Sequence, residues 1–336
     1  PGGGEGPVSR ARAALGVVVC LAAALLVAPS SALAVTGDPS AAQARASQWW
    51  LAGLGVSKAQ EVTRGEGVTV CVVDAFFDTS HPDFVGADVS VGADLTHATL
   101  SDFVGDPQKD HGTAMAALIV GQGSGPGRLE GTLGTAPKSK VRWVTVSVGK
   151  GPSTLDGIKE CADLGADVIS VSMSGSWQPA AVAYAQARDA VVVVATGNGG
   201  SSQKISDLAG LWGVLSVTGV DASLQRDPRA NTAPASFPFS EIKPEPKNED
   251  RGGSAVAGPY SRVASTSAAC QDIVTPKIGG GYRGACGTSD ATAIVAGIVA
   301  LVRSAHPDLN AANVVNRIVR TTKPSGATSL PSVPLG

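Results

Sequence analysis

The stretch GVTVCVVD at residues 67–74 indicates the class of fold. Its residues from Val68 to Val73 are apolar or β-branched on both faces, and an acidic residue, Asp74, follows directly. A strand that is apolar on both faces is typical of a parallel sheet covered by helices on each side. Ligands of such sheets bind at the carboxyl ends of the strands, so we look for functional residues there.

Segments of the same kind recur along the chain and alternate with longer, helix-like segments. Strands are predicted at residues 67–73, 141–147, 167–173, 190–195 and 213–219, and helices at 111–121, 154–165, 178–188 and 289–305. This alternation predicts an α/β fold, a three-layer α/β/α sandwich with a mainly parallel central sheet. The region 222–263 is rich in proline and charge and shows no such periodicity, so we expect a polar insertion loop there.

The composition excludes several classes of protein. The chain has 336 residues with a formal net charge of −2, which offers no basic surface for nucleic acid. Hydrophobic residues make up 43% and charged residues 16%, as in a globular protein with a substantial core. Neither paired C-x-x-C spacing nor a calcium-loop pattern occurs, so we expect no metal and no cofactor.

The N-terminal region has the pattern of a secretory signal peptide. Arg10 and Arg12 precede an apolar run from Ala13 to Val27, and Ala32 and Ala34 supply the small residues of an A-x-A cleavage site. We expect a signal peptide at 1–34, the alternative being an uncleaved membrane anchor, although the run is shorter than the ~20 residues that a span needs. The expected organisation continues with an N-terminal extension at 35–66, a catalytic domain at 67–322 and a Pro/Ser-rich tail or linker at 323–336.

Export would permit disulfides. Cys270 and Cys286 lie 16 residues apart in a glycine-rich region and could pair. Cys71 lies in a predicted strand and Cys161 in a predicted helix, where each could equally be a small buried hydrophobic residue.

Three polar clusters lie beside apolar runs: Asp74, the segment DHGT at 110–113, and the segment GTSDA at 287–291. Each one alone is compatible with a turn or a helix cap. Together they place Asp74, His111 and Ser289 in the chain order of one group of serine protease triads. A fourth residue, Asn198, follows a valine run, and its side-chain amide could donate to a developing oxyanion.

Several long segments resemble the subtilisin-like serine proteases (subtilases), and among these the mycosins of actinobacterial type VII secretion. They are TRGEGVTVCVVDAFFDTSHPDF, DHGTAMAALIVGQG, GTAPKSKVRWVTV, DGIKECADLGADVISVSMSG, VVVVATGNGG and GTSDATAIVAGIVALVRSAHPDL, together with QWWLAGLGV for the mycosins. The resemblance covers roughly residues 47–322. It implies a subtilisin-like fold and an exported serine endopeptidase that acts on a protein or peptide substrate. It also implies contact with membrane components of a secretion system.

The resemblance assigns a role to each matching position. Ser289 would be the nucleophile, His111 the general base, and Asp74 the residue that orients the imidazole. Asn198 would form the oxyanion hole with the backbone N–H of Ser289. The expected substrate-binding residues are Ser172, Met173, Ser174 and Gly175, which would pair with substrate backbone, and Ala195, Thr196 and Gly197, which would form a wall of the specificity pocket.

The chain departs from the subtilase pattern at several positions. Phe76 and Phe77 stand near the expected triad carboxylate and could crowd it. Ala293 stands where most subtilases have a proline after the nucleophile, and the segment at 268–270 replaces the usual Ala-Pro-Gly turn. Mycosins also carry a C-terminal membrane span, so we expect either free secretion or a span beyond Gly336.

These departures favour a second hypothesis, a catalytically weak homologue that serves as a structural or binding component of a secretion complex. Two other classes of enzyme are excluded by their motifs. A dinucleotide-binding enzyme would need G-x-G-x-x-G after the first strand, and an α/β-hydrolase would need G-x-S-x-G around Ser289.

Overall fold

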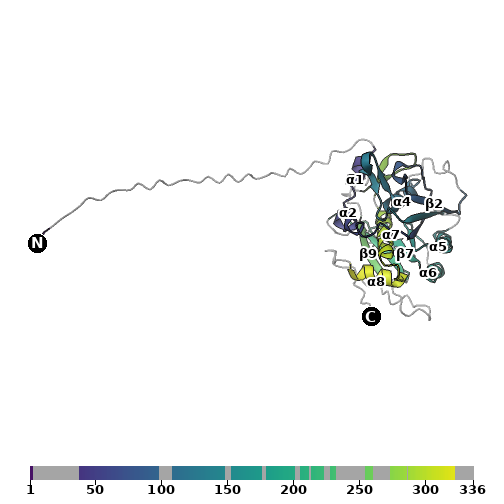
Figure 1. Cartoon of the computed structure of the whole chain (residues 1–336). Coiled ribbons are helices and arrows are strands. Elements are labelled where there is room, and N and C mark those ends of the chain that lie inside the picture. Colours follow the sequence, from purple (N-terminus) through teal and green to yellow (C-terminus); the bar gives the residue numbers. More distant parts are fainter. Residues whose placement is uncertain are drawn as a thin grey trace. The chain divides into compact units, whose positions relative to one another are not determined.

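A parallel sheet runs through the described part of the chain, which comprises residues 1–2, 38–97, 108–147, 153–175, 179–200, 205–211, 213–222, 228–231, 254–259, 273–285 and 287–321 of a computed structural model (Figure 1). Seven described strands pair in the order β2-β5-β1-β6-β7-β8-β9, and every neighbouring pair is parallel. Their bounds are β1 Thr69–Asp74, β2 Asp88–Asp94, β5 Lys140–Thr145, β6 Val168–Val171, β7 Val191–Ala195, β8 Val214–Val220 and β9 Ser254–Pro259. The predicted α/β fold with a mainly parallel sheet is confirmed.

The five predicted strands are the central ones, and the two that the sequence did not predict are the edges. The edge strand β2 is largely exposed or half-buried, so it lacks the apolar run that identified its neighbours. The other edge strand, β9, lies inside the region 222–263 that we expected to be an insertion loop. That expectation was therefore wrong for residues 254–259, while residues 223–227, 232–253 and 260–263 lie outside the described part.

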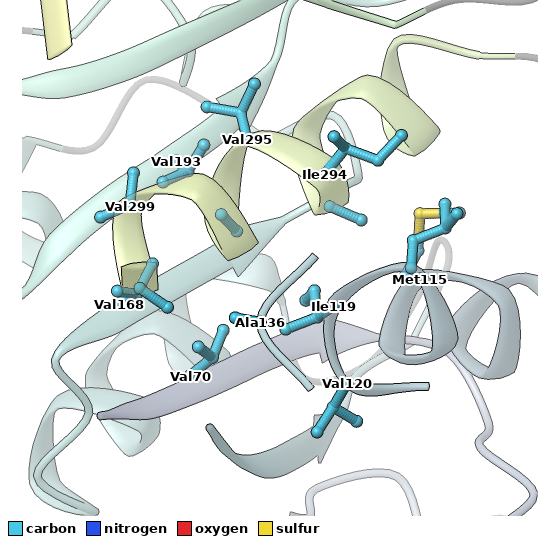
Figure 2. Close-up of a cluster of buried hydrophobic side chains, with 14 of the residues drawn as sticks. Val70, Met115, Ile119, Val120, Ala136, Val168, Val193, Ile294, Val295 and Val299 are labelled. Carbon is cyan, nitrogen blue, oxygen red and sulfur yellow. The ribbon is translucent and has the colours of Figure 1, made fainter. Parts of the chain in front are cut away.

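Helices cover both faces of the sheet. Successive side chains of each strand point to opposite sides, and because the central strands are apolar throughout, both faces must be buried. On one face α4 (His111–Val120) and α7 (Thr288–Ala305) pack against strand residues such as Val70, Val168 and Val193 (Figure 2). The helix α8 (Ala311–Thr321) adds buried residues to the same core. On the other face α5 (Thr154–Asp163) and α6 (Pro179–Gln186) pack against Val73 and Val192. The predicted three layers are confirmed, and two separate hydrophobic cores result.

A disulfide between Cys71 and Cys161 joins the sheet to one of its covering helices. Cys71 lies in β1 and Cys161 in α5, their Cα atoms are 5.6 Å apart, and both side chains are fully buried. The expectation that these two could be separate small hydrophobic residues was wrong, because the packing of α5 on β1 brings them together. The other pair considered, Cys270 and Cys286, lies outside the described residues.

Two antiparallel hairpins stand beside the main sheet. One consists of β3 (Gln122–Ser124) and β4 (Glu130–Leu133), the other of β10 (Ile273–Pro276) and β11 (Tyr282–Ala285). The short 3-10 helix η1 (Pro82–Phe84) lies close to the first hairpin, and η3 (Pro126–Arg128) forms part of its turn.

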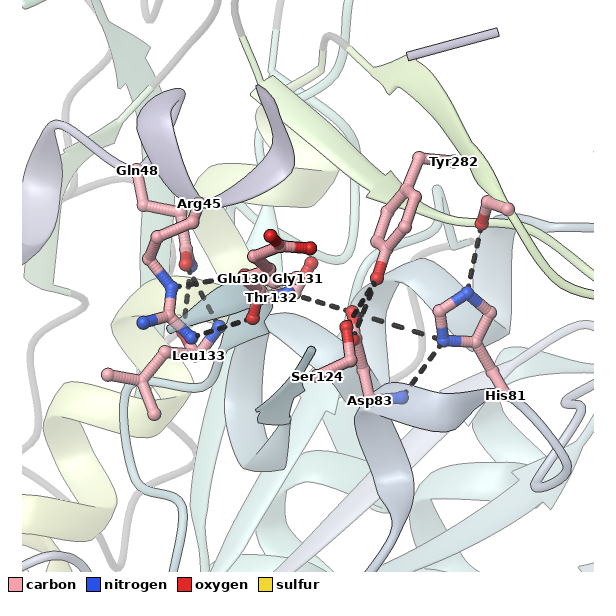
Figure 3. A network of polar contacts seen from close by, with 11 residues as sticks. Arg45, Gln48, His81, Asp83, Ser124, Glu130, Gly131, Thr132, Leu133 and Tyr282 are labelled. Atoms are coloured by element: carbon pink, nitrogen blue, oxygen red, sulfur yellow. Dashed lines mark hydrogen bonds and ion pairs between the residues drawn. The ribbon is translucent and has the colours of Figure 1, made fainter. Parts of the chain in front are cut away.

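Three short helices in the predicted N-terminal extension pack against these hairpins and the core. They are α1 (Ala41–Ala46), α2 (Trp50–Gly53) and α3 (Val56–Ala59), and the side chain of Trp50 is fully buried in the core beneath α4 and α7. The Arg45 guanidinium donates to the backbone carbonyls of Arg128, Glu130 and Gly131 at 3.0–3.1 Å. The Gln48 amide pairs with both backbone groups of Leu133, at 2.7 and 2.9 Å (Figure 3).

A buried polar cluster links η1 to both hairpins (Figure 3). Asp83 accepts hydrogen bonds from the Tyr282 hydroxyl at 2.8 Å and from the Thr132 N–H at 2.7 Å. His81 accepts from the Asp83 N–H through Nδ1, which leaves Nε2 to donate to the Gly281 carbonyl at 2.9 Å. His81 thus caps η1.

One described helix, α7, is long and apolar enough by composition to cross a membrane, but 72% of it is buried in the fold, as in the core helix of a globular domain. The predicted signal peptide apart from residues 1–2, and the predicted tail at 323–336, lie outside the described residues.

Candidate active site

Asp74 is the last residue of β1 and lies at the carboxyl edge of the sheet. Its side chain is 2% exposed, and one of its carboxylate oxygens accepts the N–H of Ala75 at 2.7 Å. Ser172 follows β6 and Asn198 follows β7 at the same edge, because β1, β6 and β7 are parallel neighbours. Three of the predicted site residues therefore meet through the topology of the sheet alone.

His111 is the first residue of α4, and a glycine brings that helix close to the backbone after β1. A Cβ atom at Gly112 would lie 2.6 Å from the carbonyl oxygen of Phe76, so only glycine permits this approach. The imidazole Nδ1 consequently lies 2.8 and 2.9 Å from the two carboxylate oxygens of Asp74. The geometry makes Nδ1–H the donor in this pair, which leaves Nε2 of a neutral imidazole as a base.

The charges around His111 favour its protonated form. Burial, the largest single influence, lowers the pKa of the imidazole, whereas the charge of Asp74 and its hydrogen bond raise it. Asp290 adds to the rise and Arg283 opposes it, so the pKa of His111 lies above its ordinary value. The site is therefore suited to hold a proton on this imidazole during a reaction.

Ser289 lies in the first turn of α7 and is 9% exposed. Its Oγ donates to the carbonyl oxygen of Ser172 at 3.0 Å, and the Oγ of Ser172 donates to the carbonyl oxygen of Ser289 at the same distance. This reciprocal pair joins the start of α7 to the end of β6, and it defines the orientation of the Ser289 hydroxyl in the free protein.

Asn198 is exposed, and its side chain is oriented by the start of α7. Its Oδ1 accepts the N–H of Thr288 at 2.8 Å and the Thr288 hydroxyl at 3.1 Å. A backbone N–H can only donate, so the side-chain atom that faces Thr288 must be the oxygen Oδ1, and the amide nitrogen Nδ2 points away from Thr288. Nδ2 lies 3.3 Å from where a Cβ of Gly287 would stand, beside Ser289.

A pocket of about 420 Å³ joins the predicted catalytic residues to part of the predicted substrate-binding segment. The residues that line it are Asp74, Ala75, Gln108, His111, Ser147, Ser153, Thr154, Leu155, Ser172, Met173, Ser174, Gly175 and Ser289. Asp74 and His111 are the titratable residues among them, so the other described lining residues are uncharged. Most of these are small or polar, and Leu155 and Met173 are apolar.

The second predicted substrate-binding segment does not line this pocket. Thr196 is 4% exposed and its N–H is bonded to Val217, while the N–H of Gly197 donates to the Thr288 hydroxyl at 3.1 Å. Gly197 has φ +106°, a conformation that suits glycine. Together with Ala195 at the end of β7, these residues hold Asn198 and the start of α7.

Sequence reasoning missed several lining residues, namely Gln108, Ser147, Ser153, Thr154 and Leu155. Ser147 follows β5 and Ser153 is the N-cap of α5, so both lie at the carboxyl edge of the sheet. That position was the signal that could have identified them.

Two of the departures from the subtilase pattern, Phe77 and Ala293, are accommodated in the core, whereas Phe76 is half-buried close to Asp74 in the sequence. Phe77 is 3% exposed and packs between Phe84 and Trp143, with ring centroids 4.9 and 4.6 Å away, so its ring lies in the core. Ala293 is fully buried, and α7 continues without a break from Thr288 to Ala305. The segment 268–270 lies outside the described residues.

The described residues include no group of three or more His, Cys, Asp or Glu side chains that could hold a metal ion.

Comparison with known proteins shows the family to which the chain is related. The model of the subtilase family (Peptidase_S8) matches residues 65–333. The chain is 29% identical over 317 residues to Mycosin-3 of Mycobacterium tuberculosis, covering 80% of this chain and 65% of that protein, so it spans slightly less than two thirds of that relative. It is 30% identical over 268 residues to a subtilisin of Bacillus pumilus, covering 76% of this chain and 84% of that protein.

Among solved structures, MycP1 from the ESX-1 type VII secretion system matches with a TM-score of 0.60 and 25% identity, covering 83% of this chain and 80% of that chain.

Proposed function

The chain belongs to the subtilase family, and we propose that it is an exported serine endopeptidase that hydrolyses peptide bonds through Asp74, His111 and Ser289. One observation carries the proposal. The Asp74 carboxylate and the His111 imidazole are hydrogen-bonded at 2.8 and 2.9 Å on the wall of a pocket that Ser289 also lines. These three residues come from distant parts of the chain, so their meeting in one pocket supports a shared chemical role.

In the proposed reaction Ser289 Oγ attacks the carbonyl carbon of the scissile peptide bond. Its proton moves to Nε2 of His111, and Asp74 stabilises the resulting imidazolium through Nδ1–H. The tetrahedral intermediate collapses, the C–N bond breaks, and His111 returns the proton to the leaving amine. Water then hydrolyses the ester on Ser289 by the same route, with His111 again accepting and returning the proton.

The hydroxyl of Ser289 must turn before it can react. In the free protein it donates to the carbonyl of Ser172, so the nucleophile is held away from productive contact until substrate is bound. Because the segment from Ser172 to Gly175 lines the pocket, a substrate that pairs with this segment as an added strand would compete for the same carbonyl. Substrate binding would thereby release Ser289 toward His111.

Asn198 is proposed to stabilise the oxyanion together with the backbone N–H of Ser289. The anchoring of its Oδ1 by Thr288 supports this role, because it orients Nδ2 in advance and the donor need not reorganise during the reaction. The first turn of α7 adds the positive end of the helix dipole.

The substrate is proposed to be a protein or peptide bound in extended form, with small or uncharged side chains in the pocket. The uncharged lining outside Asp74 and His111 supports this preference. The net charge of −2 gives no support to a nucleic-acid partner.

Export and a role like that of mycosins in type VII secretion form the finer part of the proposal. The signal-peptide pattern at residues 10–34 supports export, and so does the disulfide between Cys71 and Cys161, since disulfides persist in oxidising compartments. The likeness to Mycosin-3 and to MycP1 supports contact with secretion-system membrane components and a place in the cell envelope.

The N-terminal extension is proposed to remain attached after export. The hydrogen bonds of Arg45 and Gln48 to the β3–β4 hairpin and the full burial of Trp50 support this, because removal of the extension would expose that core. N-terminal sequencing of the secreted protein tests it. We expect a start close to residue 35, and a mature start near Gly65 would contradict it.

A fluorophosphonate probe on the purified secreted chain tests the proposed chemistry. We expect covalent labelling of the wild-type protein, loss of labelling in Ser289→Ala, and unchanged labelling in the control Ser90→Ala, whose serine is exposed on β2. Absence of labelling in the folded wild-type chain, or labelling that survives Ser289→Ala, would instead favour a catalytically weak homologue that acts as a structural component.

A further inference from the structure

Asp290 is a buried carboxyl group that the proposed reaction does not use. It directly follows Ser289 in the first turn of α7, its side chain is 2% exposed, and its Oδ1 is buried without a hydrogen-bond partner in the described part of the chain. A buried carboxylate oxygen without a partner is unfavourable for folding. The position of this group next to the nucleophile therefore calls for a functional explanation.

Three charged or titratable groups interact with Asp290, each from a different element. They are His111 at the start of α4, Arg283 in β11, and Asp74 at the end of β1. The pKa of His111 is in turn influenced by Asp74, Asp290 and Arg283. A cluster of two acidic groups and one basic group therefore acts electrostatically on the imidazole, and Asp74 is also hydrogen-bonded to it.

Arg283 completes the cluster without neutralising it. Its Nε is buried and makes no hydrogen bond within the described residues, and it lies 3.6 Å from a carboxylate oxygen of Asp110. Asp110 immediately precedes His111 and also accepts the N–H of Ile278 at 2.8 Å. The positive charge of Arg283 therefore interacts with Asp110 as well as with Asp290. Asp290 is not fully compensated by Arg283, and it still raises the pKa of His111.

We propose that Asp290 is a positioning residue for His111, a second carboxyl group that, balanced by Arg283, sets the pH range in which the imidazole can activate Ser289. The inference rests on the proposed function. Asp290 does not line the pocket, so it acts through His111 and makes no contact with substrate.

The direction of the effect follows from the charges. Ionised Asp290 favours the imidazolium and raises the pKa of His111, while Arg283 lowers it. Burial raises the pKa of Asp290 to about 6, so this carboxyl group is ionised at neutral pH and becomes neutral in acid. At neutral pH both Asp74 and Asp290 would stabilise the imidazolium that forms in the transition state.

The pH dependence of fluorophosphonate labelling tests this inference, because the labelling rate reports activation of Ser289 and needs no natural substrate. In the wild-type chain the rate should fall in acid as His111 becomes protonated. In Asp290→Asn the midpoint of this fall should move to lower pH by at least about 0.5 unit, and the rate on the plateau should decrease. Asp290→Glu should return the midpoint toward that of the wild type.

Arg283→Gln provides a second, independent variant with the opposite sign. Loss of its positive charge should move the midpoint to higher pH, so the inference stays testable even if Asp290→Asn fails to fold. The control is Asp163→Asn, which removes a carboxyl group that is 51% exposed on α5 and should leave the midpoint unchanged.

The possible results separate this inference from the function on which it rests. Labelled Asp290→Asn and Arg283→Gln variants whose profiles coincide with that of the wild type, or shift in the same direction, would overturn the role of Asp290 alone. Absence of labelling in the wild-type chain at every pH would overturn both.

Discussion

Removal of the disulfide between Cys71 and Cys161 should destabilise the protein strongly while leaving the active site assembled. The perturbation is the double variant Cys71→Ala/Cys161→Ala. Both side chains are fully buried, and the bridge joins β1, which ends in Asp74, to α5, which begins beside the pocket. The same link therefore supports the fold and connects two sides of the site.

The expected loss follows from the length of chain that the bridge closes. The two cysteines are 90 residues apart, and the entropy of closing such a loop in the unfolded chain corresponds to about 4–5 kcal/mol at 25 °C. For a domain of this size that change lowers Tm by roughly 7–9 °C, since the entropy of unfolding is about 2.1 cal/mol/K per residue. Strand β1, which ends in Asp74, remains paired with β5 and β6, so the labelling rate at 20 °C should change less than about threefold.

Urea unfolding of the secreted, oxidised chain measures the effect, with the wild-type protein unfolded in the presence of dithiothreitol as the matched control. The double variant and the reduced wild type should unfold at similar urea concentrations, both well below the oxidised wild type. The folded wild type should resist dithiothreitol without urea, because both sulfur atoms are buried. Equal midpoints for the variant and the oxidised wild type, or two free thiols at these positions by mass spectrometry, would refute the reasoning.

Three further changes give distinct results. Asn198→Ala should lower the turnover number by about 10²–10³-fold with little change in KM, measured with a cleavable peptide, and an unchanged turnover number would exclude Asn198 as an oxyanion donor. Gln48→Ala leaves the N–H and carbonyl of Leu133 unpaired and should lower the free energy of unfolding by about 2–3 kcal/mol in urea titrations, whereas a loss below about 0.5 kcal/mol would contradict the docking of the extension. Asp290→Asn should be more stable than the wild type at pH 8, by up to about 3 kcal/mol, and equally stable near pH 4. The reason is that the folded-state pKa of Asp290 is about 6 against an ordinary 3.8, so the folded protein loses stability as pH rises through that range; a gain that is the same at both pH values would argue against a raised pKa.

The central strands and the predicted catalytic residues were accessible from the sequence because their signals are local. A strand that is buried on both faces must be apolar throughout, and this identified β1, β5, β6, β7 and β8. Polar residues directly after such strands, or at the start of a buried helix, stand out against the apolar background. Asp74, Asn198 and Ser289 were found in this way.

The edge strands could not be predicted from the sequence, because an edge strand need not be apolar on both faces. Strand β2 begins and ends with aspartate and is partly exposed along its length, and β9 lies in a region of proline and charge. Asp290 was visible as an acid at the head of a buried helix, but its significance depends on Arg283 and His111, which lie in other elements.

The sequence by itself determined the α/β class, the family, and the residue types available for acyl transfer, since these follow from periodicity and from short motifs. Only the tertiary structure decided which of these residues meet. It joined Cys71 to Cys161 across 90 residues, oriented the Ser289 hydroxyl toward Ser172, and grouped Asp290 with His111. The physical reason is that hydrogen bonds, disulfides and charge interactions act over a few ångströms in space, and distance along the chain does not determine that separation.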